Sequence, residues 1–420
     1  MRVGILKFTA ICGLLLFGAL SLNAQKKGAT KIETTVLETA TPEEMGMDSK
    51  KLQRVDDIIN AAIGKKEIPG AVIAVVKDGK MVYKKAYGNK SVYPSVEKMT
   101  ENTVFDLASF SKCVGTTLSM MHLLEEGGFR LIDRVDMYIP GFQPYVDPKT
   151  GEKVNIRIID LLTHSSGLPP YVQPDVVIKE KGAADPDSLM SYICTMKRVY
   201  KPTTDFQYSC LNFITLQNVL QNITGKKLED YAQENIFDKM GLTSTCYNPL
   251  NKKDKAYIER IAPTEKQPDG SVLKGVVHDP LARIMNHGNS GNAGVFSTAD
   301  DLAVIAAALM NGGTYKDKNL LGSLTVETMT RVPEETTQLG RSLGWDNYSP
   351  YASCNGNIFD PVRTYGHTGY TGTSIVIDPV AKCAVILLTH RVHPEDKGGV
   401  VRLRSLVSNV VAASINVSKR

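Results

Sequence analysis

The chain has 420 residues, of which 42% are hydrophobic and 22% are charged, so it can bury a large core and disorder is not expected. The net charge of +5 is small for this length, and the basic residues are scattered along the sequence. A nucleic-acid-binding surface is therefore not indicated. The composition favours an enzyme or a protein that binds small molecules.

The N-terminus has the pattern of a secretory signal segment. Arg2 and Lys7 flank the start of an apolar stretch over 8–22, and a cleavage junction follows at Asn23-Ala24-Gln25. We therefore predict a signal peptide over 1–24 and export of the mature protein to the periplasm. An uncleaved anchor is the alternative, but the apolar stretch is shorter than the roughly 20 residues that span a bilayer. No stable membrane span is expected after cleavage.

The next segment, residues 25–44, is polar and rich in threonine, which predicts a tether in front of a folded domain over 45–420. That domain opens with a predicted helix, capped by Asp48 or Ser49 and ending near Gly64. Two strands, over 71–76 and 81–87, follow it and are joined by a tight turn at Asp78-Gly79.

The C-terminal end mirrors this arrangement. Strands are predicted over 373–377 and 383–389, and a helix over 398–415. Between the two ends the signals are mostly helical, at 113–126, 212–223, 228–239 and 298–310. The sequence therefore predicts a mixed α/β (α+β) fold with an antiparallel sheet flanked by helices, from 45–100 and 290–420, and a mostly helical insertion over 101–289.

The cysteines do not indicate a disulfide framework or a metal site. Six follow the signal segment, widely spaced and without a CxxC pair: Cys113, Cys194, Cys210, Cys246, Cys354 and Cys383. Although export permits disulfides, a chain of this size does not need them. We expect mostly buried free thiols and no bound metal.

Ser109 precedes Lys112 by three positions at the start of an apolar helix, so both side chains are predicted on one helix face. A serine hydroxyl needs a proton acceptor before it can attack, and an amine in a desolvated pocket can serve. This spacing is common by chance. A surface serine and lysine are therefore the alternative until other segments support the chemistry.

Two later segments give that support. Tyr208 can act as a general base if a neighbouring ammonium favours its tyrosinate form. His367-Thr368-Gly369 begins a C-terminal strand, where glycine lets a substrate approach the backbone. A buried structural tyrosine and an ordinary turn explain each segment separately, but the three segments together favour a catalytic site.

With these segments in this order, the sequence resembles the serine β-lactamase-related family of class C β-lactamases, penicillin-binding proteins and family VIII esterases. The resemblance covers about 43–415 and includes Leu161–Pro169, Gly294–Leu302 and Leu343-Gly344-Trp345. It implies that Ser109 is the nucleophile, that Lys112 accepts its proton and that Tyr208 is the general base. It also implies an oxyanion hole made by the backbone N–H groups of Ser109 and Tyr370, and no cofactor.

Two positions depart from the family pattern in the substrate-binding set, which comprises Cys210, His367, Thr368 and Gly369. Cys210 stands where an amide or carboxylate side chain usually helps to hold the acyl group, and a thiol is a weak replacement. His367 stands where β-lactamases generally have lysine, and a histidine is only partly charged near neutral pH. We therefore expect weak or no turnover of penicillins.

The resulting prediction is an exported serine hydrolase that cleaves an ester or amide of a small-molecule or peptide-like substrate. Acyl transfer to another acceptor, including peptidoglycan trimming or transpeptidation, is the first alternative. A ligand-binding or sensor protein that has lost turnover is the second. Asp279, Asn292, His390 and Arg391 are further candidates for lining the cleft, although salt bridges and caps explain them equally well. The sequence indicates no oligomeric state.

Overall fold

The computed structural model describes residue 1 and residues 32–416. The predicted signal peptide beyond Met1 and residues 25–31 of the predicted tether lie outside the described residues. From Glu33 onward the chain forms one compact unit. Within the described part of the chain, no helix has the length and hydrophobicity needed to cross a membrane.

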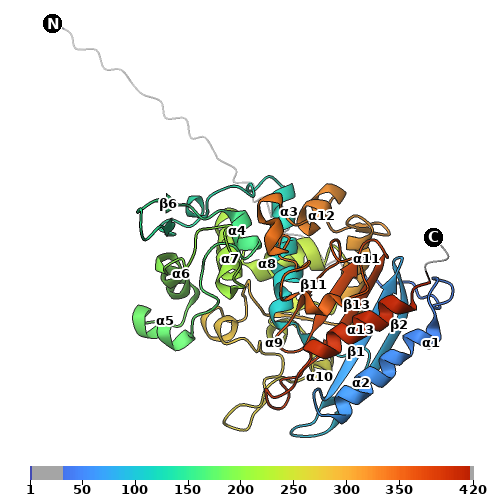
Figure 1. Cartoon of the computed structure of the whole chain (residues 1–420). Coiled ribbons are helices and arrows are strands. Elements are labelled where there is room, and N and C mark those ends of the chain that lie inside the picture. Colours follow the sequence, from blue (N-terminus) through green and yellow to red (C-terminus); the bar gives the residue numbers. More distant parts are fainter. Residues whose placement is uncertain (2–31, 417–420) are drawn as a thin grey trace. The chain divides into compact units, whose positions relative to one another are not determined.

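A six-stranded antiparallel sheet combines both ends of this unit (Figure 1). In spatial order its strands are β11 (Tyr365–Thr368), β12 (Ser374–Asp378), β13 (Cys383–Thr389), β1 (Gly70–Lys77), β2 (Lys80–Ser91) and β3 (Glu97–Lys98). β1 pairs with β13, with Ala71 opposite Thr389. The β1–β2 turn has positive φ at Asp78 and Gly79 (48° and 75°), as the predicted tight hairpin requires.

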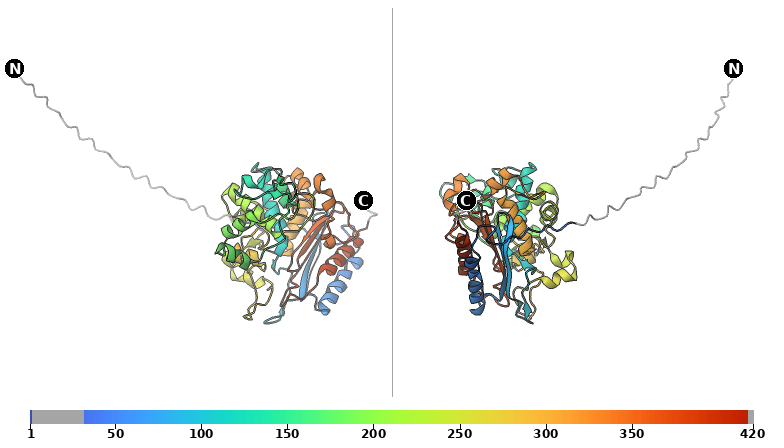
Figure 2. Two further views of the ribbon diagram at one scale, coloured as in Figure 1. Left: turned by 60° about the vertical axis from the view of Figure 1, so that its left-hand side comes forward. Right: turned by 90° about the vertical axis from the view of Figure 1, so that its right-hand side faces the viewer.

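Two layers cover the sheet, which explains why every residue of β1 and β13 is buried. On one face lie α1 (Ser49–Leu52), α2 (Arg54–Gly64) and α13 (Val401–Ser414), as Figure 2 shows. Their apolar residues, including Val55, Ile59 and Val407, pack against alternate strand residues such as Ile73 and Val385. On the other face, α11 (Ala299–Met310) packs against β1 and β13 within the larger hydrophobic core.

The helical part of the fold adjoins that second face. Its α-helices are α3 (Leu118–Glu125), α4 (Ile158–Leu162), α5 (Pro174–Lys181), α6 (Pro186–Thr195), α7 (Cys210–Thr224), α8 (Leu228–Ala232), α9 (Pro249–Lys252) and α10 (Lys255–Arg260). One further α-helix lies outside this part: α12 (Ser323–Thr330). The predicted antiparallel sheet with flanking helices and a helical region is confirmed.

Several short elements complete the fold. A second sheet has the order β4 (Phe105–Asp106), β8 (Val295–Ser297) and β7 (Cys246–Tyr247), and two small hairpins pair β5 (Tyr145–Val146) with β6 (Lys153–Val154) and β9 (Thr314–Tyr315) with β10 (Lys318–Asn319). The helix predicted over 228–239 becomes a π-helix after Ala232, and the one predicted over 113–126 starts as a π-helix at Lys112–Thr117. The six cysteines named above are unpaired, and all except Cys210 are buried.

The described part of the predicted tether, residues 32–44, packs against the domain, which corrects the sequence interpretation. The Thr35 N–H donates to the Gly241 carbonyl (3.1 Å), and the Ala40 N–H donates to the Met81 carbonyl (3.1 Å). Leu37 is buried in the main core. Threonine and valine suit extended pairing as well as a polar linker, so composition alone does not distinguish the two.

Candidate active site

Ser109 lies in a tight 3-10 turn, Ala108–Phe110, between β4 and the helix that begins at Lys112. Ala108 has a φ of +46°, which is uncommon for a residue with a side chain. The Asp106 carboxylate accepts a hydrogen bond from the Ala108 N–H (2.8 Å) and holds this conformation. Such backbone strain often accompanies functional sites, and here it occurs next to the predicted nucleophile.

Lys112 is completely buried, and its ammonium donates to the Ser109 hydroxyl over 3.0 Å. The same nitrogen donates to the Asn292 carbonyl (3.0 Å) and contacts the Cys210 sulfur at 3.6 Å. The predicted contact between Ser109 and Lys112 is therefore present, although Ser109 lies in the turn before the helix and not on a shared helix face. Asn292, a candidate from sequence, contributes a backbone oxygen that directs the ammonium.

Tyr208 lies against this pair, with its ring centre 4.9 Å from the Lys112 nitrogen. Its hydroxyl is buried and has no hydrogen-bond partner among the described residues. The loop at His164–Pro170 fixes the segment, because the Gln207 N–H donates to the His164 carbonyl (3.2 Å) and the Cys210 N–H to the Pro170 carbonyl (2.9 Å). Ser109 and Lys112, from one segment, and Tyr208, from another, are thus brought together.

The protonation of this group differs from the sequence argument. Burial raises the pKa of Tyr208 above its ordinary value, although Lys112 acts in the opposite direction. Burial disfavours the Lys112 ammonium, but the charges that Cys210 and Tyr208 carry when ionised outweigh it, so the pKa of Lys112 is raised. Both shifts are in the direction of the protonated forms of Tyr208 and Lys112. The expected shift of Tyr208 toward tyrosinate is not found.

The turn between β11 and β12 approaches Ser109 closely. Thr371 Oγ1 donates to the Asp106 carbonyl (2.8 Å), and Thr373 Oγ1 donates to the Leu107 carbonyl (3.0 Å). A β-carbon added to Gly369 would lie 2.2 Å from the Leu107 oxygen, so only glycine permits this approach. Tyr370 follows directly, which brings its backbone to the same side of the site as Ser109.

His367 lies on β11 and is almost completely buried. Its Nδ1 donates to the Thr368 carbonyl (2.9 Å), which leaves Nε2 as an acceptor without a partner among the described residues. Burial, together with the positive charges of Arg341 and Lys112, holds the pKa of His367 well below its usual range. The sequence argument expected a partly charged histidine, whereas the structure has a neutral one.

Cys210 opens α7 beside Lys112, and burial raises the pKa of its thiol even though Lys112 opposes the shift. Asn212 does not replace the missing amide at this position. Its side chain donates to His164 Nδ1 (3.2 Å) and accepts from the Ser166 hydroxyl (2.5 Å). Asn212, His164 and Ser166 thus shape the loop that holds Tyr208.

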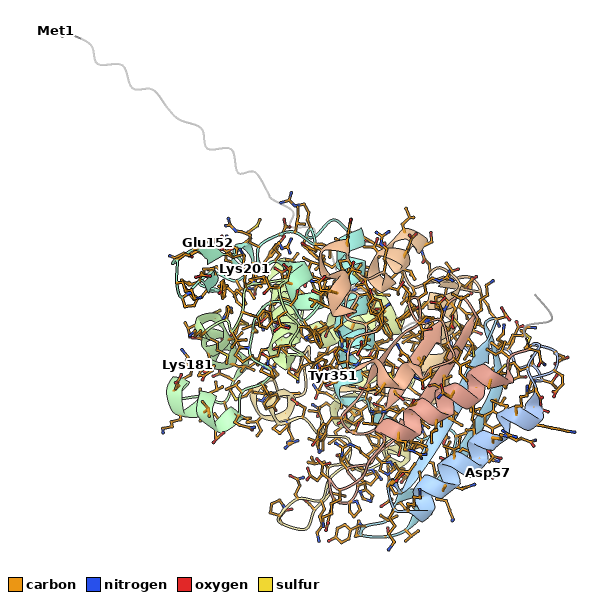
Figure 3. All side chains as sticks on the ribbon, viewed as in Figure 1. Met1, Asp57, Glu152, Lys181, Lys201 and Tyr351 are labelled. Atoms are coloured by element: carbon orange, nitrogen blue, oxygen red, sulfur yellow. The ribbon has the colours of Figure 1, made fainter. Side chains whose placement is uncertain are left out.

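A cavity of about 460 Å³ opens next to Ser109. It is lined by Ser109, Tyr208, His367, Thr368, Gly369, Tyr370 and Tyr351 together with three arginines, Arg341, Arg391 and Arg404. Tyr351 is exposed and lies beside the ring of Phe206, where the sheet part and the helical part meet (Figure 3). The wall therefore carries three guanidinium groups and the carboxylate of Asp346, and the exposed Tyr351 ring lies at its edge.

Sequence analysis named Arg391 but missed Arg341 and Arg404. Both are buried, at 1% and 7% exposure, and no local pattern distinguishes a buried arginine from a surface one. Arg341 pairs with Asp346 (3.1 Å) and precedes the Leu343-Gly344-Trp345 segment, which was the only available signal. His390 is not a lining residue, because it is buried and its Nε2 donates to the Lys90 carbonyl (2.7 Å).

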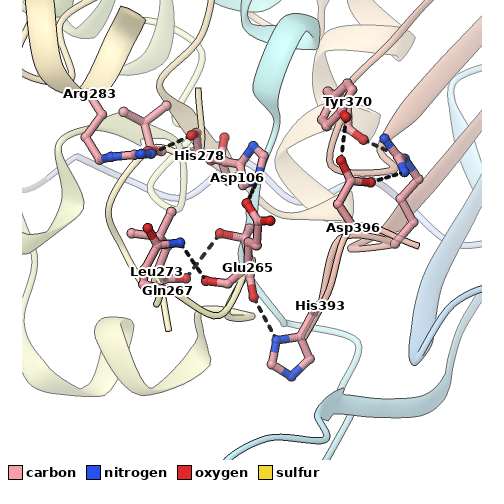
Figure 4. A network of polar contacts seen from close by, with 12 residues as sticks. Asp106, Glu265, Gln267, Leu273, His278, Arg283, Tyr370, His393 and Asp396 are labelled. Atoms are coloured by element: carbon pink, nitrogen blue, oxygen red, sulfur yellow. Dashed lines mark hydrogen bonds and ion pairs between the residues drawn. The ribbon is translucent and has the colours of Figure 1, made fainter. Parts of the chain in front are cut away.

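Tyr370 is held by Arg391 and Asp396. Arg391 Nε donates to the Tyr370 carbonyl (2.9 Å), and Asp396 accepts hydrogen bonds from Arg391 and from the Tyr370 hydroxyl (Figure 4). Within residues 32–416 no cluster of three or more histidine, cysteine or acidic side chains could hold a metal ion.

Comparison with known proteins shows which family the chain resembles. The model of the β-lactamase family matches residues 55–407. An N-acetylmuramyl-L-alanine amidase of Bacillus subtilis (strain 168) is 33% identical over 92% of this chain and 90% of its own. A putative D-alanyl-D-alanine carboxypeptidase of Escherichia coli (strain K12) is 33% identical over 89% and 90%, respectively.

Solved structures show the same fold. EstCE1, a hydrolase with promiscuous acyltransferase activity, superposes with a TM-score of 0.67 at 21% identity, over 86% of this chain and 99% of its own. A class C β-lactamase from Rhodobacter sphaeroides superposes with a TM-score of 0.63 at 21% identity, over 85% and 98%. The match along most of the sequence and the shared fold lead to one conclusion: the chain belongs to the β-lactamase family.

Proposed function

We propose that this protein is an exported serine acyl hydrolase that cleaves an ester or amide through an acyl-enzyme on Ser109. The observation that carries the proposal is the hydrogen bond from the buried Lys112 ammonium to the Ser109 hydroxyl (3.0 Å), with Tyr208 stacked against the same nitrogen. An amine that is hydrogen-bonded to the serine and a phenol ring beside that amine supply the proton acceptors that a serine nucleophile needs. The adjacent cavity gives a substrate access to this group.

The chemistry follows from these positions. Ser109 Oγ attacks the acyl carbon, and its proton passes to the Lys112–Tyr208 pair, one member of which first has to lose its own proton. The N–H groups of Ser109 and Tyr370 stabilise the negative oxygen of the tetrahedral intermediate. The leaving alcohol or amine takes the proton, which leaves an ester on Ser109. Water then loses a proton to Tyr208 and attacks that ester. The acyl–Oγ bond breaks, the proton on Tyr208 passes to Ser109 Oγ, and the acid is released.

The substrate preference is expected to favour simple esters over β-lactams. His367 is neutral and Cys210 replaces the usual amide, so two groups that hold a β-lactam in the family are changed. Purified protein should therefore cleave a short-chain p-nitrophenyl ester with a much higher kcat/KM than nitrocefin. A high kcat/KM for nitrocefin would contradict this expectation.

The nucleophile itself is tested by covalent labelling. A fluorophosphonate should add to the unmodified protein and not to Ser109→Ala, as measured by intact mass. Labelling of neither protein would favour a ligand-binding protein without turnover, which is the non-catalytic alternative. Labelling of both at the same site would assign the nucleophile to another residue.

A second candidate function is removal of a C-terminal residue from a peptide. Relatives of this chain carry the names D-alanyl-D-alanine carboxypeptidase and N-acetylmuramyl-L-alanine amidase, and the cavity has three arginines that suit a peptide carboxylate. A short peptide that ends in D-Ala-D-Ala distinguishes the two functions, since release of free alanine supports the peptidase. The same assay with an added alcohol or amine detects acyl transfer through the formation of a new ester or amide.

Export is also part of the proposal and rests on the pattern at Arg2–Gln25. We expect the protein recovered from the periplasm to lack residues 1–24, and intact mass measures this directly. A full-length mass in that fraction would favour the uncleaved anchor.

A further inference from the structure

Arg404, in the first turn of α13, is buried without an acidic partner. It is 7% exposed, and no carboxylate forms an ion pair with it in the part of the chain that the structure describes. Burial lowers its pKa to about 10, so the guanidinium is still charged at neutral pH. Burying an unpaired charge is costly for folding. The hydrogen bonds of Arg404 show what the buried guanidinium does in the fold.

Those contacts are two backbone carbonyls of the turn beside Ser109. Arg404 Nη2 donates to the oxygen of Gly369 and to the oxygen of Thr373, both over 2.8 Å. The Thr373 carbonyl also accepts from the Gly369 N–H (2.7 Å), which closes the turn. Arg404 therefore bridges the two ends of the five-residue segment 369–373, whose second residue is Tyr370.

The Gly369 carbonyl belongs to the same peptide unit as the Tyr370 N–H. The cis peptides of the described chain are at Pro94 and Pro394, so this unit is trans, and its C=O and N–H point in opposite directions. Arg404 holds the carbonyl on the α13 side, and the Gly372 N–H donates to the same oxygen (3.1 Å), so the Tyr370 N–H points away from α13. The direction of the proposed oxyanion donor is thus set through its own peptide bond.

We propose that Arg404 is a positioning residue that orients and polarises the 369–370 peptide, so that the Tyr370 N–H serves as an oxyanion donor. The inference rests on the proposed acyl-enzyme function of Ser109 and adds a residue to it. A positive group on the carbonyl draws electron density from the peptide, which makes the N–H a stronger donor. The bonds from Thr371 and Thr373 to the Ser109 loop then fix the distance between the two donors.

Arg404 also lines the cavity, so it could instead bind an anionic substrate directly. The two roles differ in their substrate dependence. A direct ion pair affects only substrates that carry a negative charge, and mainly their KM. A positioning role affects every substrate, including an uncharged ester, and mainly kcat, because the oxyanion forms only during reaction.

The test uses the mature protein, an uncharged p-nitrophenyl ester, and the variants Arg404→Gln and Arg404→Lys. Arg402→Gln is the matched control, since Arg402 lies on the same helix and is exposed. Loss of one direct oxyanion donor costs about 10²–10³ in kcat, so loss of its support in Arg404→Gln should cost roughly tenfold or more. We expect kcat to fall with KM nearly unchanged, Arg404→Lys to recover part of the loss, and Arg402→Gln to match the unmodified protein.

Other outcomes overturn the inference. An unchanged kcat in folded Arg404→Gln removes the positioning role, and an effect confined to the KM of carboxylate substrates assigns Arg404 to direct binding. Thermal unfolding shows whether Arg404→Gln folds. If it does not fold, the kcat of the folded Arg404→Lys variant is the test, and an unchanged kcat in that variant also contradicts the positioning role. If the unmodified protein cleaves the ester no faster than Ser109→Ala, the proposed function fails and the inference fails with it.

Discussion

Replacement of Lys112 by methionine is expected to lower kcat/KM for a short-chain ester by about 10³–10⁴, near the upper limit for loss of one general base. Methionine has a similar length but no amine, so it keeps the volume of the site and removes the hydrogen bond to Ser109. Tyr208 alone then has to take the serine proton, and burial works against its ionised form. Steady-state kinetics with the uncharged ester measure the loss.

Stability separates this catalytic effect from damage to the fold. A buried ammonium is expensive to desolvate, so an apolar replacement should leave the melting temperature unchanged or raise it. Lys181→Met, at an exposed lysine on α5, provides the matched control and should keep full activity. A folded Lys112→Met protein with activity within tenfold of the original would show that Lys112 is not the proton acceptor.

The second large effect is expected from Gly369→Ala. The added carbon would lie 2.2 Å from the Leu107 carbonyl oxygen and 2.3 Å from Thr373 Oγ1, so the turn has to move away from Ser109. A displacement of about 1 Å at a reacting centre can cost roughly 10² in rate. We therefore expect kcat to fall at least a hundredfold, together with a lower melting temperature.

Gly64→Ala tests whether glycine loss in general has this effect. Its β-carbon would meet nothing within 4 Å, and its place at the end of α2 suits alanine. This control should keep full activity and equal or greater stability. Comparable losses in both variants, or an active Gly369→Ala, would contradict the argument that the turn has to touch the Ser109 loop.

The sequence predicted those parts of the molecule whose signals are local. The strands at both ends are marked by alternating or continuous apolar residues, a pattern that neighbouring residues alone define. The Asp78-Gly79 turn requires positive φ, which these residue types favour. The spacing of Ser109 and Lys112 was also local. The meeting of these residues with Tyr208 could be expected only from family resemblance, because their separation along the chain carries no geometric information.

What could not be predicted depends on burial and on long-range contacts. The neutral state of His367 arises from Arg341 and Lys112, which lie far from it in sequence. The raised pKa of Tyr208 likewise reflects how completely the site is closed from solvent. Arg404 could not be identified from sequence because it binds two backbone carbonyls, and every residue has a backbone carbonyl whatever its side chain.

The pairing of β1 with β13 also bears on how the chain acquires its structure. Ala71 and Thr389 are neighbours in the sheet although almost the whole folded unit separates them in sequence. Closing so long a loop is entropically expensive and makes such contacts form late. During synthesis the central strand has no partner on one side until the last strands leave the ribosome. The chain therefore stays without its finished sheet until translation is nearly complete.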